Sequence, residues 1–280
     1  LRVRDGQLST GDALRFMAAS PPPARPRHAV GRVTTARLAL YGKPLPRITD
    51  AVRIGELLRL ALMGRARRLF GDAIPASLSG HDLPPGNRHG HAFFLPEGNR
   101  DGRIDHLLVH APDGLDAKAQ AAIADLALIY SREGTEWRIL LEGLGEPAQF
   151  EQHSELLREA NSWESVTPYL HPWHRKRGFE IPEQIGRECR LRGLPGPSLV
   201  EPLPDRQPRT LDFHRFRSKR GLDQPDRQGN MLRLEFPEPV RGPVALGFGC
   251  HFGLGLFRAA IATARTGVGN VPSHQAAQET

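Results

Sequence analysis

The stretch of sequence that decides the fold reads Gly247-Phe248-Gly249-Cys250-His251-Phe252-Gly253-Leu254-Gly255-Leu256-Phe257. Its four glycines alternate with apolar and aromatic residues, directly after the strand-like segment 244–246. Glycine reaches positive φ and lets another backbone approach closely, so this glycine-rich run can bend and present its amides. Such a run either packs against the protein itself or lies against a ligand.

The composition favours an anionic ligand. The 280 residues include 38 Lys+Arg and 31 Asp+Glu, a formal net charge of +7. A basic surplus is typical of proteins that bind nucleic acid, although an inert basic surface accounts for it equally well. The two cysteines, Cys189 and Cys250, form neither a metal-spaced pair nor a disulfide framework, which fits a reducing compartment. With no signal peptide and no apolar run of membrane length, we expect a cytoplasmic protein.

The pattern along the chain predicts two similar blocks between loose ends. We interpret residues 1–30 as a linker or the remnant of a preceding domain, and residues 259–280 as a flexible tail. The first block, residues 31–147, is predicted to run in this order: strand 33–41, helix 48–70, hairpin strands 91–96 and 103–110, helix 115–130 and strand 136–142. This βαββαβ order is that of a ferredoxin-like unit.

The second block, residues 148–258, has a less regular pattern. It is predicted to run in this order: strand 163–170, helix 182–192, strands 198–203, 210–217 and 231–236, and a last segment that enters the glycine-rich run. The predicted fold class is therefore α+β, with tandem ferredoxin-like domains and a C-terminal glycine-rich loop.

These features together resemble the RAMP superfamily of CRISPR-associated RNA-binding proteins. The likeness is carried by Gly42-Lys43-Pro44-Leu45-Pro46, His89-Gly90-His91-Ala92-Phe93-Phe94-Leu95-Pro96, Asp101-Gly102-Arg103-Ile104-Asp105-His106, Trp163-Glu164-Ser165-Val166-Thr167-Pro168 and the segment 242–257. The sequence is most similar to the repeat-processing endoribonuclease of that superfamily, in the fused form found in type I-U (I-G) systems. An RNA-scaffolding domain precedes the processing domain in that form, which would explain residues 1–30.

The resemblance implies metal-independent cleavage of CRISPR precursor RNA within its repeats, leaving a 5′-hydroxyl and a 2′,3′-cyclic phosphate. It implies no cofactor and no metal. The implied partners are the precursor RNA, the mature crRNA and other subunits of a type I interference complex, with no membrane. A catalytically silent RAMP subunit that only holds the crRNA end is the alternative.

Metal-free RNA cleavage needs a base for the 2′-hydroxyl proton, an acid for the 5′-oxygen and cationic support for the phosphorane. Histidine suits both proton transfers because its pKa lies near neutrality. Among 12 histidines, four lie in or beside the first-block hairpin: His89, His91, His106 and His110.

A turn at residues 99–102 would pair Gly98 with Arg103, and strand alternation then places His91, His106 and His110 on one face of the sheet. We predict His91 as the base and His106 as the acid or a phosphate contact, with His89 as the third catalytic candidate and His81 in reserve. Each is equally accounted for as a hydrogen-bonded strand residue. A zinc site on His89, His91 and His106 is a weaker alternative, because no Cys or Glu-x-x-His pattern supports it.

Two clusters that mix cations with aromatic side chains are predicted to bind RNA, the cations on phosphates and the aromatics on bases. The first surrounds Trp173 and supplies Arg175, Lys176 and Arg177. The second interleaves with Phe213 and Phe216 and supplies Arg215, Arg217, Lys219 and Arg220. A solvated basic edge is the alternative for both clusters. The glycine-rich run completes the predicted RNA-binding set with Gly247, Gly249, His251, Gly253 and Gly255.

Overall fold

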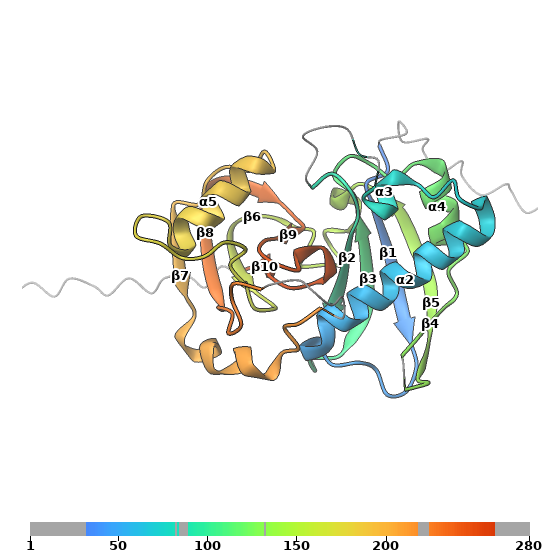
Figure 1. The fold of residues 1–280 in the computed structure, drawn as a ribbon, viewed down its shortest axis with the longest axis horizontal. Coiled ribbons are helices and arrows are strands. Elements are labelled where there is room, and N and C mark those ends of the chain that lie inside the picture. The colour runs from blue at the N-terminus through green and yellow to red at the C-terminus, as the bar shows by residue number, and fades with distance from the viewer. Residues whose placement is uncertain (1–31, 82, 84–88, 132, 218–223, 261–280) are drawn as a thin grey trace, which may run out of the picture. The chain divides into compact units, whose positions relative to one another are not determined.

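Two antiparallel five-stranded sheets form the protein, and each has the strand order of a ferredoxin-like unit (Figure 1). The computed structural model describes residues 32–81, 83, 89–131, 133–217 and 224–260. All of these belong to one compact unit that begins at Arg32. Within this described part of the chain, no helix has the length and apolar character needed to cross a membrane.

The first sheet has the order β2-β3-β1-β5-β4. Its strands are β1 (Thr35–Tyr41), β2 (Phe93–Gly98), β3 (Ile104–His110), β4 (Leu128–Tyr130) and β5 (Glu136–Gly145). Its helical segments are η1 (Ile48–Asp50), α2 (Ala51–Phe70), α3 (Ala76–Ser79) and α4 (Ala117–Ala124). Leu58 and Leu62 of α2 and Ile123 of α4 pack with Leu38 of β1 in one buried cluster. Without the short β4, this is the predicted βαββαβ unit.

Two predicted details of this half are wrong. The predicted helix 115–130 ends at Ala124, because Ile129 is buried opposite Trp137 and the segment 128–130 adds a strand to the sheet edge. The hairpin register also differs, since Gly98 pairs with Ile104 instead of Arg103 and Phe93 faces His110. The Asn99 side chain accepts hydrogen bonds from the amides of both Asp101 and Arg103, which widens the turn.

The second sheet has the order β7-β8-β6-β10-β9. Its strands are β6 (Glu159–Ser165), β7 (Leu199–Pro202), β8 (Leu232–Arg241), β9 (Val244–Ala245) and β10 (Leu256–Ala259). Its helical segments are α5 (Ile181–Leu191), η3 (Pro204–Asp212) and η4 (Cys250–Phe252), and η2 (Pro147–Phe150) precedes it. The order matches the first sheet, but the place of its second helix, between β8 and β10, is taken by β9 and the glycine-rich run.

The predicted strand at 210–217 is wrong. Residues 204–212 form the 3₁₀ helix η3, and residues 213–217 are not part of a sheet. Pro204 starts the helix, where its fixed φ suits the first turn. The predicted strand 163–170 also ends early, at Ser165, because Pro168 has no N–H for a sheet ladder.

The two halves pack through the face of the first sheet that α2 and α4 leave open. Alternate residues of β2 and β3, namely Phe93, Leu95 and Leu108, form one buried cluster with Ala245, Cys250 and Leu256 of the second half. The glycine-rich run therefore lies at the junction, in contact with β2 and α2.

Candidate functional site

The glycine-rich run folds into a loop that only glycine permits at several positions. Its four glycines have φ of +89° at Gly247, +76° at Gly249, +87° at Gly253 and +55° at Gly255. A Cβ at Gly255 would lie 1.8 Å from the Leu246 carbonyl oxygen, and one at Gly253 would lie 2.6 Å from Pro96 Cδ. Three of the glycine amides donate to protein groups: Gly247 to Glu188, Gly253 to Cys250 and Gly255 to Pro168. The glycine-rich run therefore packs against the protein itself, which is one of the two alternatives given above. RNA binding by the glycines stays a prediction.

A buried ion pair on α5 holds the loop in place. Glu188 Oε2 accepts a hydrogen bond from the Gly247 amide at 2.7 Å and lies 3.0 Å from Arg192 Nη2. Its other oxygen accepts from the Tyr169 hydroxyl at 3.0 Å. Arg192 in turn donates to the Ala245 carbonyl and lies 3.4 Å from Cys250 Sγ. Burial raises the pKa of Glu188, and the Arg192 charge opposes that rise. Every partner that a buried carboxylate needs is thus present.

The loop places His251 against the first half. Its ring stacks on Phe93 with centroids 3.8 Å apart and on His91 with centroids 4.1 Å apart, almost parallel in the second case. Its Nε2 lies 3.3 Å from Nδ1 of His89. Three histidines, two from the start of the hairpin and one from the other end of the chain, therefore form one cluster.

The hydrogen bonds fix the proton positions in this cluster. His251 Nδ1 lies 3.1 Å from the Ala92 carbonyl oxygen, which can only accept, so Nδ1 carries the proton. Burial, followed by the charge of His91, lowers the pKa of His251 well below its usual value, so the ring is neutral and Nε2 accepts. His89 Nδ1 must then donate. Both ring nitrogens of His251 are engaged with the protein, and the predicted RNA contact of His251 stays a prediction.

His91 stacks on the loop through His251 and lies within the electrostatic influence of Arg59. Burial, then the charges of Arg59 and His81, lowers the pKa of His91, so the imidazole is neutral at pH 7. Its Nδ1 is buried and has no hydrogen-bond partner among the described residues. Gly80, in a left-handed conformation after α3, gives the ring its space, since a Cβ there would lie 2.9 Å from the ring. Arg59 is fixed by a bond of 3.1 Å to the Ser79 carbonyl.

His106 lies elsewhere. It lies on the same face of β3 as His110, as predicted, but four residue steps along the strand, roughly 13 Å, separate the two. Its Nδ1 is 2.8 Å from Asp105 and its Nε2 is 3.5 Å from Glu142. His110, opposite Phe93, bonds Thr35 Oγ1 at 2.9 Å, and burial lowers its pKa to about 4. The structure thus joins His89 and His91 but not His106.

The arginines of the two predicted basic clusters have different partners in the structure. Arg175 pairs with Glu180 at 2.7 Å on an exposed loop that includes Lys176 and Arg177. Arg215 donates to the carbonyls of Thr210 and Gln228, whereas Arg217 pairs with Glu56 of α2 at 3.1 Å, so the two do not share a strand face. Lys219 and Arg220 lie outside the described residues.

Sequence reasoning missed the residues that support the cluster. Glu188 and Arg192 are spaced i, i+4 around the apolar Cys189, which is the one signal that a buried helical ion pair leaves in a sequence. Arg59 reaches His91 only through the packing of α2 on the hairpin, and no local pattern indicates this. Among the described residues, no group of three His, Cys, Asp or Glu side chains is arranged to hold a metal ion.

A scan against protein families and a search of curated proteins found no match to this chain. Among solved structures, a Cas6 product complex aligns with a TM-score of 0.40 and 13% identity, over 81% of this chain and 99% of that chain. A structure described as a RAMP protein binding different RNA substrates aligns with a TM-score of 0.39 and 10% identity, over 82% and 100%. Likenesses this distant assign no activity, and the ferredoxin-like fold rests on the strand order of the two sheets.

Proposed function

We propose that this chain is a cytoplasmic RNA-binding protein of the RAMP kind that cleaves CRISPR precursor RNA within its repeats without a metal ion. In this proposal it corresponds to the processing half of the fused type I-U (I-G) protein and retains the crRNA within a type I interference complex. The observation that carries the proposal is the cluster of His89 and His91, held together by His251 and flanked by Arg59.

His91 is the general base in this mechanism, because a neutral imidazole can accept the 2′-hydroxyl proton. The 2′-oxygen attacks the adjacent phosphorus, the bond to the 5′-oxygen breaks, and a 2′,3′-cyclic phosphate remains. We assign the acid step to His89 in its doubly protonated form, which gives a proton to the leaving 5′-oxygen, while its Nδ1 lies beside Nε2 of His251. Arg59 supports the charge of the phosphorane. His106 takes no part in this step.

The test is cleavage of labelled repeat RNA in the presence of EDTA. We expect the full chain to give a product with a 2′,3′-cyclic phosphate. His91→Ala should lower the cleavage rate by about 10²- to 10⁴-fold and leave RNA affinity unchanged. His106→Ala, the matched control on the same hairpin, should change the rate by less than a few-fold.

The catalytically silent scaffold is the second candidate. It is favoured by the engagement of both His251 nitrogens and three glycine amides within the protein, as expected of a structural junction. Tight binding of repeat RNA without any cleavage would support this scaffold and end the nuclease proposal.

A further inference from the structure

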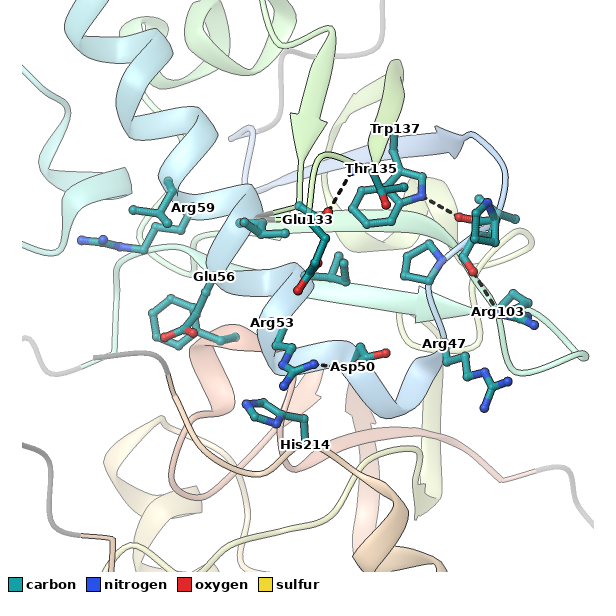
Figure 2. A pocket seen from close by; sticks show the side chains of 18 of the residues that line it. Arg47, Asp50, Arg53, Glu56, Arg59, Arg103, Glu133, Thr135, Trp137 and His214 are labelled. Atoms are coloured by element: carbon teal, nitrogen blue, oxygen red, sulfur yellow. Dashed lines mark hydrogen bonds and ion pairs between the residues drawn. The ribbon is translucent and has the colours of Figure 1, made fainter. Parts of the chain in front are cut away.

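A groove of about 960 Å³ runs along the exposed side of α2 (Figure 2). Residues 44–47 and the turn around Glu133 and Thr135 border it on the first half, and residues 214, 216 and 217 of the second half complete it. The second basic cluster predicted from the sequence contributes Phe216 and Arg217 to this lining.

Arginine dominates the lining of the groove. Its cations are Arg47, Arg53, Arg59, Arg103 and Arg217, and its carboxylates are Asp50, Glu56 and Glu133. Phe216 lies at the groove with 44% of its surface exposed, an unusual fraction for an aromatic side chain. Arginine with an exposed aromatic ring is the combination that binds phosphates and stacks unpaired bases.

Several of these arginines are already held in position. Arg217 pairs with Glu56 at 3.1 Å and lies over the Phe252 ring at 4.0 Å. Arg103 donates to the Leu45 carbonyl at 3.1 Å. A guanidinium fixed in this way loses little side-chain entropy when it binds a phosphate. The pair Arg53–Asp50, at 3.4 Å and largely exposed, is weak enough to exchange partners.

Two lining residues, Arg59 and Phe252, relate the groove to the histidine cluster. Arg59 lines it and is also one of the charges that lower the pKa of His91. Phe252, another lining residue, directly follows His251 in the chain. Arg59 bonds the carbonyl of Ser79, next to the glycine that contacts the His91 ring, so Arg59 marks the end of the groove that leads toward the imidazoles.

We infer that this groove binds the single-stranded RNA segment that adjoins the cleaved phosphate, with its backbone on the arginines and a base stacked on Phe216. The inference rests on the RNA-binding part of the proposed function. Duplex RNA does not fit this assignment, because paired bases have no free face for Phe216. An acidic peptide is the competing occupant, which the exposed aromatic ring does not favour.

The experiment measures binding of a fluorescent oligouridylate to the full chain by anisotropy. Phe216→Ala should weaken binding by roughly 5- to 100-fold, and Phe216→Trp should retain it, because one stacked base is removed and then restored. Arg47→Ala combined with Arg53→Ala should weaken binding by about 10-fold and reduce its salt dependence. Arg67→Ala, an exposed arginine of α2 outside the lining, is the control and should change binding by less than about 2-fold.

Wild-type affinity in both groove variants would overturn the inference, as would displacement of the oligouridylate by polyglutamate but not by unlabelled RNA. The two proposals fail separately. If the protein cleaves repeat RNA and the groove variants bind RNA normally, the nuclease proposal stands and the groove assignment fails. If RNA binds through the groove but is not cleaved, the groove assignment stands and the nuclease proposal fails.

Discussion

The two halves of this protein share a strand order and differ at one connection. In the first half, α4 links β3 to the last strands and covers the sheet with buried residues such as Ala119, Ala122 and Ile123. In the second half, the glycine-rich run occupies the corresponding place between β8 and β10. The helix α4 covers the core of its own half, whereas the glycine-rich run packs against the first half and places His251 in the histidine cluster there.

At this connection the second half has an irregular loop instead of a helix, and the loop positions His251 against the first half. The helix α4 bonds its amides within itself and to its own cap, Asp116, whereas three amides of the loop donate to Glu188, Leu170 and Pro168 outside it. The conformation of the loop therefore depends on its surroundings, and substitutions in it should cost more than comparable substitutions in the first half.

The largest expected effect comes from Gly255→Ala. A Cβ there meets the Leu246 carbonyl at 1.8 Å, and the backbone has φ of +55°. We expect a loss of about 4 kcal/mol or more in the free energy of unfolding, measured by urea denaturation. Gly134→Ala in the first half has φ of +87° but no atom within 4 Å, so it should cost about 1–2 kcal/mol. Equal costs would mean that the loop is no more constrained than an ordinary turn.

The second effect concerns the ion pair that holds the loop. Glu188→Gln leaves the Arg192 charge buried without a carboxylate, and we expect a loss of about 3 kcal/mol in stability by thermal unfolding. Glu155→Gln removes the exposed partner of Arg258 in the same half and should cost less than about 1 kcal/mol. A Glu188→Gln protein as stable as this control would show that the pair does not anchor the loop.

The smallest effect is a shift in a pH profile. Burial and the Arg59 charge keep the pKa of His91 below its usual value. The proposed mechanism requires the neutral ring, so we expect the cleavage rate to fall as pH falls through that pKa. Arg59→Met removes the charge and raises the pKa, which moves the acidic limb of the rate profile to higher pH. Arg67→Met, on the same helix but outside the groove and not among the charges acting on His91, should leave the limb in place. If the acidic limb did not move in Arg59→Met, the general base would be a group other than His91.

Much of the fold follows from local patterns in the sequence. The helices 48–70 and 182–192 have amphipathic spacing and appear at α2 and α5 within a few residues. The errors arose where long-range pairing decides the outcome. The segment 128–130 pairs with β5 at the edge of the sheet. Residues 210–217 have strand-like alternation, but none of the strands in the described part of the chain pairs with them. Alternation alone does not supply a partner.

The site could be predicted only in part. Alternation along one strand correctly predicts that His106 and His110 share a face, because both lie on β3. The predicted register, which decides what lies opposite them, is wrong by two residues. The meeting of His251 with His89 joins residues 162 positions apart and depends on how the two halves pack. Sequence periodicity does not indicate such a contact. The sequence therefore identifies the glycine-rich run as important but predicts His251 as an RNA contact, separate from the catalytic candidates His89 and His91.

The distance in sequence between the partners of the histidine cluster also sets when the cluster can form. Chains emerge from the ribosome N-terminus first, and domains commonly fold as they appear. His89 and His91 are made early, but Phe93 and His91 receive the His251 ring only after nearly all of the described chain has been synthesised. The histidine cluster is thus among the last features of the described residues to be completed.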